Sequence, residues 1–164
     1  MPEEIKSAVY ERQLIVFNIA NEEFGFDIND VREIIKLVDI TKIPDIEDYF
    51  KGIINLRGNV IGVIDLAKKL HMQEKAVDDR TRIIVVEVDT DQVGLLVDEV
   101  SEVLRINSDK IEPAPALITN KVHAAYIEGV GIIDERMIIL LNIRSLLGEK
   151  IIEQLKEISK KEKT

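Results

Sequence analysis

The sequence contains no cysteine, which excludes disulfide bonds and thiolate chemistry. It also has only two histidines, His71 and His123. Zinc sites are built from closely spaced cysteine and histidine ligands. We therefore expect no metal and no cofactor, and we interpret both histidines as surface residues.

Long hydrophobic runs are missing as well. The apolar stretches are only a few residues long, whereas a membrane-spanning helix needs ~20 apolar residues. The first residues lack the basic region and apolar core of a secretory signal peptide, and the absence of cysteine fits a reducing compartment. We therefore expect a cytoplasmic protein without membrane insertion, with residues 1–8 frayed.

Basic residues are outnumbered by acidic ones. The chain has 22 Lys and Arg against 31 Asp and Glu, so its formal net charge is −9. Nucleic-acid binding depends on clustered Lys and Arg, so we expect no nucleic-acid partner. A small barrel that binds nucleic acid is an alternative that this charge argues against. Apolar residues make up 46% of the 164 residues, which is typical of a folded globular protein.

The most informative feature that is present is an internal repeat. Residues 14–37 align with 83–106 at an offset of 69, and all twelve large apolar positions of the first segment fall on large apolar residues of the second. The match resumes at an offset of 77, where Gly52 meets Gly129. Any two β-rich stretches share some pattern, but a gapless match of this length indicates a duplication.

Each half is predicted to consist mostly of β-strands. Runs rich in β-branched residues at 14–19 and 83–88 favour strands. A Gly-Asn turn between two apolar runs predicts a hairpin over 53–64. A further strand is predicted over 38–43, ended by Pro44.

Helical segments follow the hairpins. Asp65 and Asn142 stand at equivalent positions and are typical N-caps, so each is expected to begin a helical turn. Apolar residues at 147, 151, 155 and 158 lie on one helical face. They predict a C-terminal helix over 149–162 that packs on the β structure, the alternative being a detached helix that binds a partner.

These elements predict a mainly β fold. About five short strands per half favour two small barrels, because closing a sheet removes its exposed edges. We expect one domain over 9–150, made of pseudo-repeats at 14–70 and 83–147 that are joined by a polar linker at 71–81.

Carboxylates are the only abundant candidates for catalysis. The pairs Asp78-Asp79 and Asp89-Thr90-Asp91 fall in predicted turns, where aspartate stabilises the turn itself. Hydrolysis would need paired acids in a concave site that excludes water. No enzymatic activity is expected, and a small ligand-binding or hydrolytic barrel is the alternative.

One arginine is a candidate for recognition. The segment Asn55-Leu56-Arg57-Gly58 places a guanidinium at the tip of an apolar hairpin. Arg57 is either a solvated turn residue or a recognition residue, since the planar guanidinium binds carboxylates and carbonyls directionally. Composition does not separate the two.

An ordered set of motifs over about residues 12–150 resembles the CheW family. Its parts are FGFDI at 24–28, VREI at 31–34, IP at 43–44, GIINLRG at 52–58, VIDL at 63–66, VGLLVDEV at 93–100, PAP at 113–115 and GVG at 129–131. The tail beyond residue 150 matches no motif of the family.

The resemblance implies two intertwined SH3-like barrels with a groove between them. It also implies a non-catalytic adaptor that joins the cytoplasmic tip of a chemoreceptor to the regulatory domain of the histidine kinase CheA, which has the same fold; a fragment of that kinase is the nearest alternative. The kinase-contact residues are not assigned. The receptor-facing residues that the matching motifs imply are Val31, Glu33, Ile34, Gly52, Asn55, Arg57, Gly58 and Val103. For Val31, Ile34 and Val103 core packing is the competing interpretation.

Overall fold

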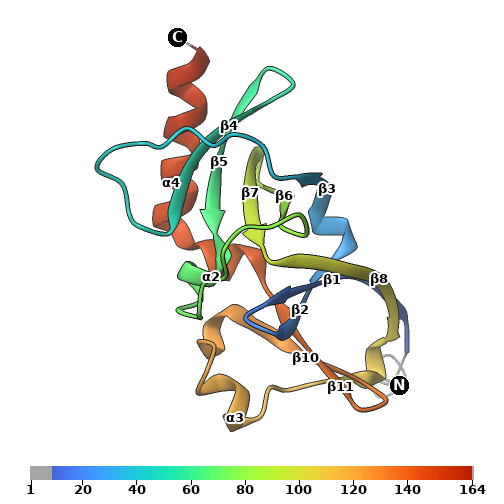
Figure 1. Ribbon diagram of the computed structural model, residues 1–164. Coiled ribbons are helices and arrows are strands. Elements are labelled where there is room, and N and C mark those ends of the chain that lie inside the picture. Colours follow the sequence, from blue (N-terminus) through green and yellow to red (C-terminus); the bar gives the residue numbers. More distant parts are fainter. Residues whose placement is uncertain (1–8, 164) are drawn as a thin grey trace.

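A computed structural model describes residues 9–163, with side chains described as far as Ile158; the segment 1–8, expected to be frayed, lies outside the described residues. The described chain forms two β-sheets (Figure 1). The six-stranded sheet has the order β8-β1-β2-β11-β10-β9 and comprises β1 Glu11–Ile19, β2 Glu22–Asp27, β8 Glu99–Asn107, β9 Ile111–Glu112, β10 Ile127–Ile133 and β11 Arg136–Leu141. The five-stranded sheet has the order β3-β6-β7-β5-β4 and comprises β3 Val31–Lys36, β4 Phe50–Leu56, β5 Asn59–Asp65, β6 Arg82–Val88 and β7 Asp91–Val97.

Each sheet contains strands from both halves of the chain. Exchanging each strand for its counterpart in the other half converts one strand order into the other, apart from the two-residue strand β9. Two parallel pairs, β2 with β11 and β5 with β7, join the halves, while the other strand pairs are antiparallel. This arrangement confirms the predicted mainly β, intertwined fold, with β9 as an addition to the five strands expected.

The turns repeat as well as the strands. Ala20 and Asp89, 69 residues apart, lie in the β1–β2 and β6–β7 turns and have φ of 51° and 57°. Arg57 and Asp134, 77 residues apart, lie in the β4–β5 and β10–β11 turns and have φ of 51° and 52°. Left-handed backbone is uncommon for residues other than glycine. The two halves therefore share their turn geometry as well as their apolar pattern.

The apolar runs are continuous because the strands at the centre of the fold are buried on both faces. Leu14 and Val16 point to a small cluster with Ile106, Ile138 and Leu140, while the alternate residues of β1 point the other way. The alternate residues belong to a larger cluster, called here the central cluster, to which both sheets contribute. Its largest fully buried members are Phe17, Ile19, Phe24, Phe26, Ile64, Leu66, Ile84, Leu95 and Ile139. The five-stranded sheet has its own small cluster of Ile54, Ile61, Val63, Ile83, Val85 and Leu96. Burial on both faces explains why these strands lack the apolar–polar alternation of a half-exposed strand.

The hairpin predicted over 53–64 is present as β4 and β5, but the strand predicted over 38–43 is not. That segment contributes one bridge, between Thr41 and Ile53. Of its side chains only Ile40 packs against the cluster of the five-stranded sheet, and Val38 is exposed. The segment therefore has too little inward-facing apolar surface to hold a full strand in place.

Short helices connect the strands. The α-helices α2 Leu66–Lys69 and α3 Ala116–Thr119 and the 3₁₀ segments η1 Ile28–Asp30, η2 Ser108–Lys110 and η3 Ala124–Tyr126 lie between them. Asp65 caps α2 by accepting from the backbone N–H of Ala67 at 3.1 Å, and Asn142 accepts from that of Ser145 at 2.9 Å. Both residues act as the N-caps that were predicted. Within residues 9–163 no helix is long and apolar enough to cross a membrane.

The last helix, α4 Ile143–Lys163, packs on the five-stranded sheet. It breaks at Gly148, where φ is 78° and ψ is 165°, and this break separates the predicted helical turn from the predicted C-terminal helix. The residues that it buries in the central cluster are Ile143, Leu146, Leu147, Ile151, Ile152 and Leu155. A Cβ atom at Gly62 of β5 would lie 3.0 Å from Leu155 Cδ2 and 3.4 Å from Ile158 Cδ1. The helix therefore lies directly on β5, and the alternative of a detached helix is wrong.

Leu155→Ala should lower the free energy of unfolding by ~2–5 kcal/mol, because truncating a buried leucine loses its transfer free energy and leaves a cavity. Glu153→Ala is the matched control, since Glu153 lies on the exposed side of the same helix and should change stability by ~0.5 kcal/mol at most. Urea unfolding of the two variants tests this. Equal stabilities would contradict the packing of α4 on β5.

Candidate functional site

The predicted receptor-facing residues, apart from Val103 on β8, lie at the two edges of the five-stranded sheet. Strands β3 and β4 end the strand order on opposite sides and are not paired with each other. Their residues are nevertheless linked in space, because Arg57 at the tip of the β4–β5 hairpin forms an ion pair with Glu33 on β3. We call the boundary between β3 and the β4–β5 hairpin, bridged by this pair, the seam.

The ion pair is bidentate. Arg57 Nη1 donates to Glu33 Oε1 at 3.2 Å, and Nη2 makes a shorter contact with Oε2. The hydrogen bond and the negative charge of Glu33 raise the pKa of Arg57. The Arg57 side chain is 68% exposed, so the pair adds little to stability. Its effect is to hold a planar cation in one orientation at the surface.

The hairpin that carries Arg57 is shaped by Asn55 and two glycines. Asn55 Oδ1 accepts from the backbone N–H of Gly58 at 2.8 Å, which closes the turn. Gly58 has φ of 87° with open space around it, whereas Gly52 has φ of 145° and a Cβ there would lie 2.1 Å from the Thr41 carbonyl oxygen. Gly52 thus has a backbone reason to be glycine, and its receptor contact stays a prediction.

The three apolar candidates differ in exposure. Val31 is half-buried against the central cluster, so packing accounts for it. Ile34 on β3 is 37% exposed and Val103 on β8 is 55% exposed. These two occupy equivalent repeat positions on edge strands of different sheets. Among the described residues, no hydrogen bond or ion pair joins Val103 to the seam.

The second half carries a counterpart of the ion pair that the sequence analysis missed. Glu102, which the repeat aligns with Glu33, pairs with Arg136 at 2.8 Å, and Arg136 also pairs with Glu23 at 2.6 Å. The hydrogen bonds from these two carboxylates raise the pKa of Arg136. The repeat aligns Arg57 with Asp134, so the arginine of the second half is displaced by two residues. The alignment of Glu33 with Glu102 was the sequence feature that could have predicted this second ion pair.

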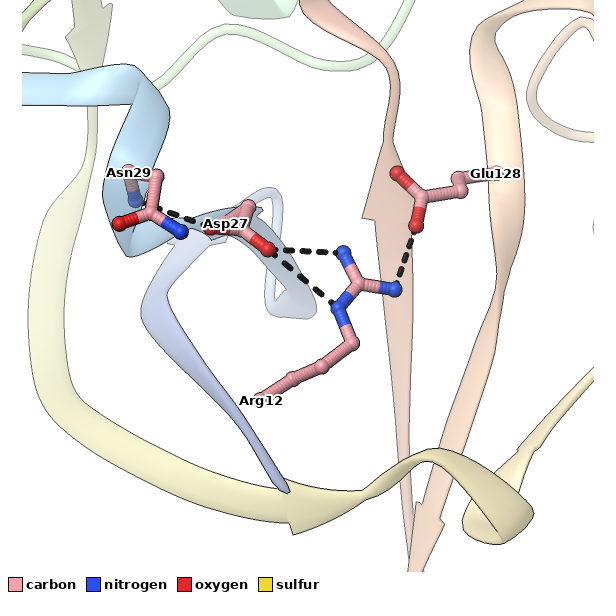
Figure 2. Close-up of polar contacts among 4 residues, drawn as sticks. All are labelled: Arg12, Asp27, Asn29 and Glu128. Carbon is pink, nitrogen blue, oxygen red and sulfur yellow. Dashed lines mark hydrogen bonds and ion pairs between the residues drawn. The ribbon is translucent and has the colours of Figure 1, made fainter. Parts of the chain in front are cut away.

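A separate polar cluster lies around Arg12 on β1 (Figure 2). Arg12 donates to Asp27 Oδ2 from Nε at 3.3 Å and from Nη2 at 3.1 Å, and Nη1 donates to Glu128 Oε1 at 2.5 Å. Asp27 also accepts from the backbone N–H of Asn29 at 2.9 Å, which caps η1. The Arg12 side chain is 13% exposed. Its guanidinium therefore ties β1 and β2 to β10, a strand of the other half.

Arg12 is the cation of this cluster, and the acidic residues around it outnumber it. Burial lowers the pKa of Arg12, but the hydrogen bonds and charges of Glu128 and Asp27 outweigh it and leave the pKa raised. The pKa of the neighbouring Asp30 is also raised, by burial and by the negative charges of Asp27 and Glu128. The cluster uses its cation internally, so it is a structural tie rather than a binding site.

Gly52→Ala should destabilise the protein by ~2 kcal/mol or more, because it combines a strained positive φ with a clash against the Thr41 carbonyl. Gly58→Ala is the matched control: it has positive φ without a clash and should cost ~1 kcal/mol. Thermal and urea unfolding compare the two. A smaller loss for Gly52→Ala than for Gly58→Ala would show that the contact with Thr41 is not restrictive.

Arg12→Leu should lower the free energy of unfolding by ~1–3 kcal/mol, because it leaves the carboxylates of Asp27 and Glu128 close together without their shared cation. Arg105→Leu on the neighbouring strand β8 is the control, since Arg105 is exposed and its ion pair with Glu11 spans 3.9 Å. Urea unfolding at low salt measures both. An Arg12 variant as stable as the control would rule out the structural tie.

Comparison with known proteins places this geometry in a family. A model of the CheW-like domain matches residues 13–150. The "Chemotaxis protein CheW" of Klebsiella aerogenes is 37% identical over 139 residues, covering 85% of this chain and 83% of the relative, and the "Probable chemotaxis protein CheW" of Rhizobium etli is 40% identical, covering 85% and 89%. The crystal structure of the scaffolding protein TtCheW from Thermoanaerobacter tengcongensis matches with a TM-score of 0.79 and 39% identity, covering 87% of this chain and 96% of that one.

Proposed function

The chain belongs to the CheW family of non-catalytic scaffolding proteins of chemotaxis signalling, and we propose that it couples the cytoplasmic tips of chemoreceptors to a CheA-type histidine kinase. In this proposal the chain itself stays in the cytoplasm and reaches membrane receptor arrays through its partners. The receptor occupies the seam, and the regulatory domain of the kinase, which shares the fold, binds elsewhere on the barrels.

The observation that carries the receptor part of the proposal is the Glu33–Arg57 pair. It fixes a guanidinium on Glu33 of β3, an edge strand, and the next residue of that strand, Ile34, is 37% exposed. An oriented charge and an exposed apolar side chain on one edge strand suit contact with a partner helix, where apolar contacts supply affinity and the charge supplies register. The helical hairpin of a receptor tip has this chemistry.

Coupling in such a complex is a linkage between two binding events. If receptor and kinase both contact one rigid adaptor, the state of one partner can bias the state of the other through differential affinity. The central cluster, which both sheets share, makes the two barrels one packed body. A rigid body of this kind transmits a displacement at one surface to the other.

The hydrolytic alternative has no support from the carboxylates that suggested it. Asp89 pairs with Arg144 at 3.2 Å and with Lys156 at 3.9 Å. Asp78 accepts from the backbone N–H of Arg80 at 2.8 Å, which closes a turn. These groups stabilise turns and ion pairs, in keeping with a non-catalytic family.

Arg57→Ala should weaken binding of a receptor-tip hairpin about tenfold or more, because a surface arginine at the centre of a recognition site is a typical hot spot. Binding to the kinase regulatory domain and the melting temperature should not change, since the Arg57 pair is exposed. Calorimetric titration of each partner measures this. Arg105→Ala is the matched control, because Arg105 is equally exposed on another strand.

Two results would contradict this role for Arg57. Lower melting temperature with weaker binding of both partners would make the residue structural. Unchanged receptor affinity in a folded variant would remove Arg57 from the receptor surface.

A further inference from the structure

The loop that joins the two strands of the seam runs across the C-terminal helix. It covers residues 37–49, between β3 and β4, and passes over α4 (Figure 1). A loop of this length is unusual in a compact domain and commonly has a function. It is pinned at intervals, because Ile40 packs in the cluster of the five-stranded sheet and Ile46 and Tyr49 pack against the central cluster.

One charged side chain ties this loop to α4. Glu47 Oε2 lies 2.7 Å from Lys150 Nζ, and Glu47 Oε1 accepts from Gln154 Nε2 at 2.8 Å. Lys150 and Gln154 are four residues apart and therefore lie on the same face of the helix. Both oxygens of the carboxylate are used, so the loop is held at one position along α4.

The contact between Glu47 and α4 affects the pKa of Glu47 and the orientation of the Gln154 amide. The hydrogen bonds from Lys150 and Gln154 lower the pKa of Glu47 to about 2. A carboxyl with a depressed pKa keeps its stabilising contacts above its ordinary value and loses them only as the pH falls through the depressed one, so this contact persists through the physiological range. The Oε1 atom of Gln154 is buried without a partner among the described residues, so Glu47 alone fixes the orientation of that amide.

The same loop is fixed to the seam at its other end. Thr41 N donates to Ile53 O at 2.9 Å, and Ile53 N donates to Thr41 O at 2.8 Å. This bridge lies beside Gly52, where the two backbones are too close for a Cβ. From Thr41 the chain leads back through Leu37 into β3, which carries Glu33. The position of the loop thus sets how β3 and the β4–β5 hairpin face each other.

We propose that Glu47 is a positioning residue for the receptor-binding seam: by anchoring the loop at 37–49 to Lys150 and Gln154 of α4, it holds the Thr41–Ile53 bridge and so the spacing between Glu33 and Arg57. This inference rests on the proposed function. It gives the C-terminal helix, whose part beyond residue 150 matches no motif of the family, a role in recognition without direct contact with the receptor.

Glu47→Ala tests the inference, with Asp48→Ala as the matched control, because Asp48 is the adjacent, exposed acid of the same loop. We expect amide hydrogen exchange at Thr41 and Ile53 to become about tenfold faster in Glu47→Ala and to stay unchanged in Asp48→Ala. The affinity for a receptor-tip hairpin should fall several-fold, while the affinity for the kinase regulatory domain and the exchange at Leu155 stay unchanged. The charge-swapped double variant Glu47→Lys with Lys150→Glu should restore both the slow exchange and the receptor affinity.

The outcomes are distinguishable. Unchanged exchange at Thr41 and Ile53 would overturn the anchor itself. Faster exchange with unchanged receptor affinity would overturn the positioning role. If the unaltered protein fails to bind the receptor tip at all, the proposed function fails and the receptor part of this inference with it, while the exchange data still decide whether Glu47 holds the loop.

Discussion

Burial of the central strands on both faces is the constraint from which the rest of the structure follows. Alternate residues of β1, such as Leu14 and Phe17, pack into different clusters, one within the six-stranded sheet and one shared by both sheets. Because the central cluster lies between the two sheets and α4, neither sheet can separate from the other without exposing an apolar face to water. The two halves of the chain also exchange strands, so each sheet contains strands from both halves and neither half can fold its sheet alone. An adaptor built this way is rigid because its two barrels share the central cluster in addition to their own small clusters.

The edge strands of the two sheets lack a paired neighbour on one side, so the packing of the centre does not determine what covers them. An unpaired edge strand is an aggregation hazard that proteins reduce with charges, short strands and covering loops. Here Glu33 and Arg57 place a charge pair at the seam, and the loop at 37–49 adds one bridge at Thr41. The pair at β3 and the bridge at β4 protect the two edges and also give the seam a defined shape, which is what a partner can recognise.

The sequence predicts local features well and distant contacts poorly. The hairpin at β4–β5, the caps at Asp65 and Asn142 and the packing of α4 follow from turn residues, cap residues and helical spacing; the pairing into intertwined barrels came from the resemblance to a family. The prediction of a strand over 38–43 was wrong, because the apolar residues of a segment do not show how many of them will face the core. The tie from Arg12 to Glu128 joins residues 116 positions apart. The spacing of residues along the chain cannot predict such a pair, because the contact depends on how the sheet brings distant strands together.

The duplication also shows where the two halves had to become different. Tyr49 and Tyr126 are 77 residues apart and thus equivalent, and both flank Lys69, whose Nζ lies 5.5 Å and 4.8 Å from their ring centroids. The counterpart of Lys69 is Leu146, which is fully buried in the central cluster. Equivalent positions of the two halves thus hold a cation over aromatic rings in one half and an apolar core residue in the other. Repeated sequence therefore maintains the shared core, while an individual contact such as that of Lys69 with the two tyrosines is made by one half only.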